Sequence, residues 1–74
     1  TIVMDIRNVF SVKLQEAIKT SHLSYAQVAK RLGITKATMS MYKNGKALPS
    51  LETFSLLCDI LDVSADFLLD KKEF

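Results

Sequence analysis

The sequence predicts an all-α fold, a compact domain of five short helices. Apolar residues recur at steps of three and four along most of the 74 residues, as they do on the buried face of a helix. Serine or threonine stands before four of these apolar stretches, where it can cap a helix. No segment alternates apolar and polar residues as a strand would. Because a chain of this length forms one domain, we expect residues 1–74 to fold as a single unit.

The first two helices are bounded by clear start and stop signals. The first is predicted at about residues 5–20, where a polar Thr-Ser-His break ends it. The second is predicted at about 25–32, because Ser24 and Gln27 form the Ser-x-x-Gln capping box of a helix start. Gly33 ends it, since glycine readily takes the left-handed C-cap conformation. The apolar stripe of the first helix consists of Ile6, Val9, Phe10, Leu14, Ala17 and Ile18.

The third helix follows after only two residues. Thr35 can cap it, and it is predicted at about 36–44 with Met39 and Tyr42 facing inward. The Asn-Gly pair at 44–45 is a strong stop signal.

The last two helices are also capped by serine. Ser50 caps a fourth helix, and the Asp-Val-Ser break at 62–64 ends it. Ser64 then caps a short fifth helix at about 65–70. The expected inner face of the fourth helix consists of Leu51, Phe54, Leu57, Cys58 and Leu61.

The second and third helices have the spacing of a helix-turn-helix over residues 24–44. Ala29 is small where the two helices would cross, and Gly33 can take a positive φ in the turn. Ile34 and Met39 are expected to anchor the turn and the third helix in the core. The rest of the third helix is left for solvent or for a DNA groove.

Charge is divided along the chain although the formal net charge is only +2. Residues 17–51 contain six lysines and arginines and no acid, whereas residues 52–70 contain five acids and no base. The acids are spread over two helices and are expected to form a solvated face. A domain with this division is a dipole whose positive side suits a polyanion.

Residues 23–46 read LSYAQVAKRLGITKATMSMYKNGK. In order and spacing, they resemble the Cro and phage-repressor family of helix-turn-helix proteins, also called the Xre family. Residues 49–53 and 61–68 resemble the same family, so the resemblance covers about residues 10–69. It implies a five-helix domain of the phage-repressor type that binds operator DNA, usually as a two-fold dimer.

The resemblance also implies a role for individual residues. In the family the third helix lies in the major groove, and phosphates are contacted from the start of the second helix and the end of the third. The implied base-contacting residues are Lys36, Ala37, Ser40 and Met41. The implied phosphate-contacting residues are Ser24, Tyr25, Lys43, Asn44 and Lys46.

The chain departs from the family pattern at several of these places. Tyr25 stands where many members have a phosphate-binding glutamine, and His22 where many have glycine. Many members pair an arginine late in the first helix with a glutamate late in the third. Here Ile18 and Lys43 hold those places, so that ion pair is absent and Lys43 is expected to face DNA.

Each of the main contact residues has an alternative interpretation. Lys36 could be a solvated surface lysine, and Met41 could pack against a partner or the rim of the core. Ser40 could simply be small enough for close approach, and Tyr25 could be a packing residue. The sequence leaves these alternatives open.

Two classes of function follow. The first is a sequence-specific DNA-binding transcription regulator of bacterial or phage origin, expected to repress by binding a palindromic operator as a homodimer. The second is a protein-interaction module that uses the helix-turn-helix as a scaffold. Either one could use the surplus apolar residues at the C-terminal end, which are Phe67, Leu68, Leu69 and Phe74. The acid-free stretch over the DNA-facing helices favours the first class.

Catalysis finds no support in the sequence. One cysteine and one histidine provide neither a zinc site nor a nucleophile pair, and Cys58 is expected to be a buried structural thiol. We therefore expect no enzyme activity, cofactor or metal. No apolar run is long enough for a membrane span and no secretory signal pattern is present, so a cytoplasmic location is expected.

Overall fold

A computed structural model describes residues 5–71, which form helices and connecting loops without a strand. The all-α prediction is confirmed. The third and fifth helices end one residue earlier than expected, because Asn44 and Asp70 act as their C-caps. The five helices are α1 (Ile6–Thr20), α2 (Tyr25–Leu32), α3 (Lys36–Lys43), α4 (Leu51–Leu61) and α5 (Ala65–Leu69).

Side-chain caps fix where the helices start. Ser24 Oγ accepts from the Gln27 amide at 3.1 Å, while the Ser24 amide donates to Gln27 Oε1 at 2.8 Å, so the predicted capping box is present. The predicted Thr35, Ser50 and Ser64 caps are likewise confirmed, each accepting from the amide three residues on. Satisfying these otherwise unpaired amides stabilises each start by about 1 kcal/mol.

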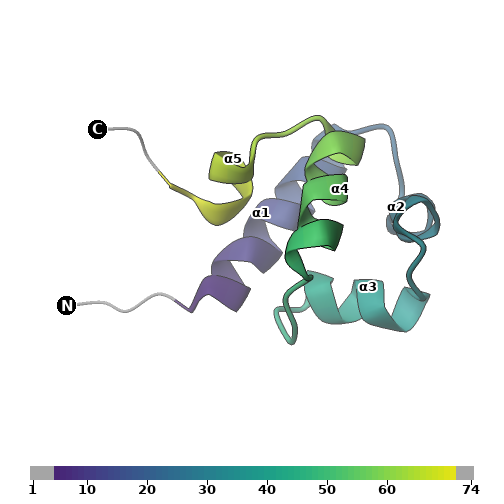
Figure 1. Cartoon of the computed structure of the whole chain (residues 1–74), viewed down its shortest axis with the longest axis horizontal. Coiled ribbons are helices and arrows are strands. Elements are labelled where there is room, and N and C mark those ends of the chain that lie inside the picture. The colour runs from purple at the N-terminus through teal and green to yellow at the C-terminus, as the bar shows by residue number, and fades with distance from the viewer. Residues whose placement is uncertain (1–4, 72–74) are drawn as a thin grey trace.

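The helices pack around a small core in which Phe10 of α1 is central. Helix α1 contacts α3 and α5, and α2 contacts α3 and α4. Figure 1 shows α3 along the lower edge with α2 beside it, and α5 on the opposite side of the molecule. Phe10 is fully buried, with its ring edge-on to Tyr42 at 6.5 Å and tilted against Phe54 at 6.0 Å. The buried core residues are Val9, Phe10, Leu14, Ala17, Ile18, Val28, Ala29, Met39, Tyr42, Leu57, Leu61 and Leu68.

Three predicted core residues are placed differently. Leu51 is 87% exposed and Ile6 is 39% exposed. Each is the first residue of its helix, so its side chain lies beyond the end of the core although it shares the apolar period. Cys58 is only partly buried, at the rim of the core, so the prediction of a buried thiol is wrong. Burial chiefly, and then the charge of Asp59, raise the pKa of this thiol.

The turn between α2 and α3 has the predicted glycine conformation. Gly33 has φ +75°, and its amide donates to the Lys30 carbonyl at 3.2 Å. The amide of Ile34 donates to the Ala29 carbonyl at 3.0 Å, which completes the C-cap of α2. The chain therefore turns sharply, and α3 starts beside α2 with its outer face uncovered.

Candidate nucleic-acid interface

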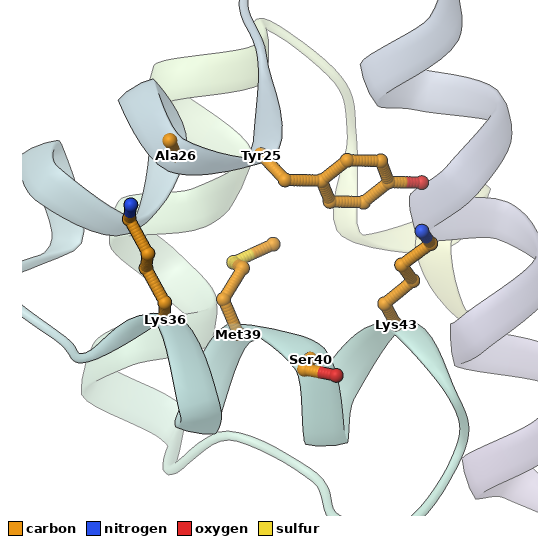
Figure 2. A pocket seen from close by; sticks show the side chains of 6 residues that line it. All are labelled: Tyr25, Ala26, Lys36, Met39, Ser40 and Lys43. Carbon is orange, nitrogen blue, oxygen red and sulfur yellow. The ribbon is translucent and has the colours of Figure 1, made fainter.

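A groove runs between the first turn of α2 and the face of α3 that lies beside it (Figure 2). Its volume is about 290 Å³, and it is lined by Tyr25, Ala26, Lys36, Met39, Ser40 and Lys43. Figure 2 shows the two lysines at opposite ends and the Met39 side chain between them. Lys43 follows Lys36 by seven positions of the helix, which is about 10 Å along the axis. The groove therefore has an apolar middle and a cation at each end.

Four of the nine predicted contact residues line this groove, which are Tyr25, Lys36, Ser40 and Lys43. Ala37 and Met41 are exposed on α3 but do not line it, and Met41 is 44% exposed. Asn44 and Lys46 are exposed just after α3, and Ser24 is exposed just before α2. The third helix thus has two adjacent exposed stripes, one along the groove and one beside it.

The Lys43 ammonium lies over the Tyr25 ring, with Nζ 4.6 Å from the ring centroid. Figure 2 shows the ring reaching from α2 across to Lys43 on α3. At this distance a cation is attracted to the negative face of the ring. Burial raises the pKa of the Tyr25 phenol. Lys43 therefore has a partner inside the domain that sequence reasoning did not find.

Two small polar residues on this surface are held by local hydrogen bonds. Ser24 Oγ accepts from the Gln27 amide and still has its own proton to donate to a phosphate oxygen. The Asn44 amide Nδ2 donates to Ser40 Oγ at 3.2 Å. This bond joins the end of α3 to the groove wall and orients both side chains.

The C-terminal end of α3 is attached to α1. Ser11 Oγ donates to the main-chain carbonyl of Lys43, and Gln15 Nε2 donates to the same oxygen at 2.9 Å. Ser11 is buried, the one polar residue among the buried side chains of residues 5–71. Sequence reasoning missed both residues. The available signal was a serine between Phe10 and Leu14, inside the buried stripe of the first helix.

The loop after α3 also lies close to α1. Gly45 has φ +73°, and a Cβ added there would lie 3.4 Å from the Arg7 carbonyl and 3.5 Å from Ser11 Cβ. Glycine is thus favoured by its backbone angle, and an added Cβ would lie in ordinary van der Waals contact with α1, which leaves little room for a larger side chain in that direction. Its amide donates to the Tyr42 carbonyl, and that of Lys46 to Met41. These bonds set the position of Lys46 relative to α3.

The charged side chains of α2 and α3 are all positive. Neither α2 nor α3 contains an acidic residue. Within the described range 5–71, the ion pairs have only Arg7 and Lys13 as their cations, on α1. The positive N-terminal ends of α2 and α3 add to the lysines around the groove. The surface can therefore bind anionic oxygens without first breaking an ion pair in that part of the chain.

Residues 5–71 were also compared with the requirements of a metal site and of a membrane-spanning helix. In the part of the chain that the structure describes, no three His, Cys, Asp or Glu side chains gather where they could hold a metal ion. Across the same residues, no helix combines the length and the apolar character that crossing a membrane requires.

Comparisons with known proteins agree with this geometry. The helix-turn-helix family model HTH_3 matches residues 14–68. The HTH-type transcriptional regulator AnsR of Bacillus subtilis is 36% identical over 61 residues, which cover 82% of this chain and 53% of AnsR. YonR of the same organism, a prophage-derived uncharacterized HTH-type transcriptional regulator, is 40% identical over 60 residues, covering 81% of this chain and 56% of YonR. The chain thus spans about half the length of these relatives.

The fold also has a counterpart among solved structures. The solution structure of the SOS-response transcriptional repressor LexA from Eubacterium rectale superposes with a TM-score of 0.83 at 24% identity. The match covers 99% of this chain and 79% of that one, and at this identity it concerns the fold alone. The family match extends from within α1 into α5 and includes the capping box, the Gly33 turn and α3. The chain therefore belongs to the Xre/Cro-like helix-turn-helix family.

Proposed function

We propose that this chain is the sequence-specific DNA-binding domain of a transcription regulator, with α3 lying in the major groove. The observation that carries the proposal is the acid-free surface formed by α2 and α3, with two exposed stripes of side chains on α3. Family membership and the regulator names of the relatives support it.

The proposed division of labour follows from where each residue lies. Base edges are read by the exposed face of α3, and phosphates are bound from both ends of the helix-turn-helix. Met41 and Ala37 provide small apolar contacts of the kind that suits a thymine methyl, and Lys36 provides a donor for a guanine edge. The proposed base contacts are Lys36, Ala37, Ser40 and Met41, and the proposed phosphate contacts are Ser24, Lys43, Asn44 and Lys46, with the Tyr25 ring beside the Lys43 ammonium.

We further propose that the regulator is a repressor that covers a promoter as a homodimer on a palindromic operator. A second apolar hollow, of about 170 Å³, lies away from the α2–α3 groove and supplies a surface for self-association. Leu69 lines it together with Leu51 and Leu48, which are 87% and 42% exposed. Leu68 is fully buried and takes no part, and Phe74 lies outside the described residues.

Selection of bound sequences from random duplex DNA tests both proposals. A palindromic consensus is the expected result, with half-sites about one helical turn apart. Sedimentation of the protein on the selected duplex should give two protomers per site. Failure to enrich any sequence would favour the interaction-module alternative, and one protomer per site would contradict the dimer.

A further inference from the structure

We propose that Tyr25 acts through its ring as a positioning residue, holding the Lys43 ammonium at the end of the groove so that it meets a DNA phosphate in a preset place. This inference rests on the proposed DNA-binding function. It differs from the expectation that the Tyr25 hydroxyl itself binds the phosphate.

The first argument is geometric. Lys43 Nζ lies 4.6 Å from the centroid of the Tyr25 ring, so the ring and the ammonium are in contact. The ring lies against the hydrophobic core and is partly buried, whereas a lysine side chain has several freely rotating bonds. The partly buried Tyr25 ring therefore restricts the movement of the Lys43 side chain.

The second argument concerns competing partners. Among residues 5–71, no carboxylate forms an ion pair with Lys43. A carboxylate would neutralise the ammonium and compete with a phosphate for it. An aromatic face leaves the positive charge and the N–H donors of Lys43 available while limiting where they can be. A neutral partner of this kind restricts the position of the cation while leaving its charge unpaired.

The third argument is that the backbone of Lys43 is also fixed. Its carbonyl accepts hydrogen bonds from Ser11 and Gln15, so the last turn of α3 is tied to α1. The ring then restricts the only remaining mobile part, the side chain. Restricting a side chain before binding lowers the entropy lost when the complex forms.

The test is a double-mutant cycle on operator affinity with Tyr25→Leu and Lys43→Ala. Tyr25→Leu should weaken binding on the order of two- to fivefold per protomer, the size of an exposed cation–π contact. In the Lys43→Ala background, the same change should have no further effect. Tyr25→Phe keeps the ring and should bind as the wild type does. Lys46→Ala is the matched control, a lysine outside the groove, and its effect should add to that of Tyr25→Leu.

A measurement without DNA separates this inference from the proposed function. In the free protein, the ring should shift the Lys43 ε-methylene proton resonances upfield, and Tyr25→Phe should retain the shift whereas Tyr25→Leu should abolish it. Normal DNA binding without this shift would overturn the inference alone. The shift without any DNA binding would overturn the proposed function and leave the contact standing.

Two further results would contradict the positioning role. Equal losses from Tyr25→Phe and Tyr25→Leu would assign the contact to the hydroxyl. An unchanged effect of Tyr25→Leu in the Lys43→Ala background would show that the two residues act independently. Circular dichroism of each variant checks that the domain is folded, and the Tyr25→Phe comparison remains informative if Tyr25→Leu unfolds.

Discussion

The Ser11 hydroxyl on α1 donates a hydrogen bond to the main-chain carbonyl of Lys43, the last residue of α3. Gln15, one turn further along α1, donates to the same oxygen. The last carbonyls of a helix have no partner inside it, so this contact satisfies one of them and fixes the end of α3. Here a neutral contact holds the helix, and the cation of Lys43 is left to the Tyr25 ring.

Replacing Ser11 with Ala should therefore loosen α3. The carbonyl keeps the Gln15 bond, so we expect the free energy of unfolding to fall by about 1 kcal/mol. Urea denaturation followed by circular dichroism measures this. The matched control is Ser55→Ala on the exposed side of α4, which should change stability by less than about 0.5 kcal/mol. Equal effects at the two sites would show that the Ser11 bond contributes nothing specific.

DNA binding should weaken steeply as salt is added. Each phosphate contact releases counterions, which gives a log–log slope of about −0.9 per contact. Titrations of labelled duplex at several salt concentrations give this slope directly. A flat response would be inconsistent with a surface whose lysines bind phosphates.

Replacing Lys46 and Lys36 in turn should distinguish a lysine that binds a phosphate from one that reads a base. Lys46→Ala should weaken binding to operator and scrambled duplex alike and reduce the salt slope by about one per protomer, because this lysine lies in the loop after α3. Lys36→Ala should cost about 1–3 kcal/mol per half-site on the operator alone. The measurement is a titration of each variant with both duplexes at two salt concentrations. An equal loss on both duplexes would assign Lys36 to a phosphate.

The two glycines should respond differently to asparagine, a residue that tolerates the left-handed region. Alanine at either Gly33 or Gly45 should cost about 1–2 kcal/mol of stability, since both have positive φ. Asparagine should cost less than alanine at Gly33, which has open space around an added Cβ. At Gly45 it should cost more, because its amide would crowd Arg7 and Ser11. Denaturant unfolding of the four variants checks this order, and the same order at both sites would argue against crowding.

Leu51→Glu should test the apolar hollow as a self-association surface. Leu51 is 87% exposed, so the change should leave the stability of the isolated domain nearly unaffected. A charge in an apolar contact between two copies should reduce dimer formation on the operator. Sedimentation with and without operator provides the readout. Unchanged two-protomer complexes would place the dimer contact elsewhere.

The sequence predicted the helices well because their signals are local. The Ser24–Gln27 capping box and Gly33 determine their own neighbourhood, and the structure has both as expected. Tertiary contacts were harder to predict. The apolar period places Leu51 on the buried stripe. It does not show that the first residue of α4 lies beyond the edge of the core.

The candidate site shows the same limit. Sequence and resemblance together named four residues that the groove brings together. They did not reveal that Lys43 lies against Tyr25 or that Ser11 reaches the end of α3, 32 residues away in the sequence. Those contacts depend on how α1, α2 and α3 cross, which no local pattern specifies.

The brevity of α3 has a thermodynamic consequence. Eight residues are too few for a helix to persist alone in water, so α3 depends on Thr35 at its start and on α1 at its end. The proposed DNA-reading surface thus disappears whenever the domain unfolds. By linkage, operator DNA at 100 times its dissociation constant should add about 2.7 kcal/mol to the free energy of unfolding. Copies bound to operator DNA should then resist proteolysis better than free copies, which limited proteolysis with and without the duplex would measure.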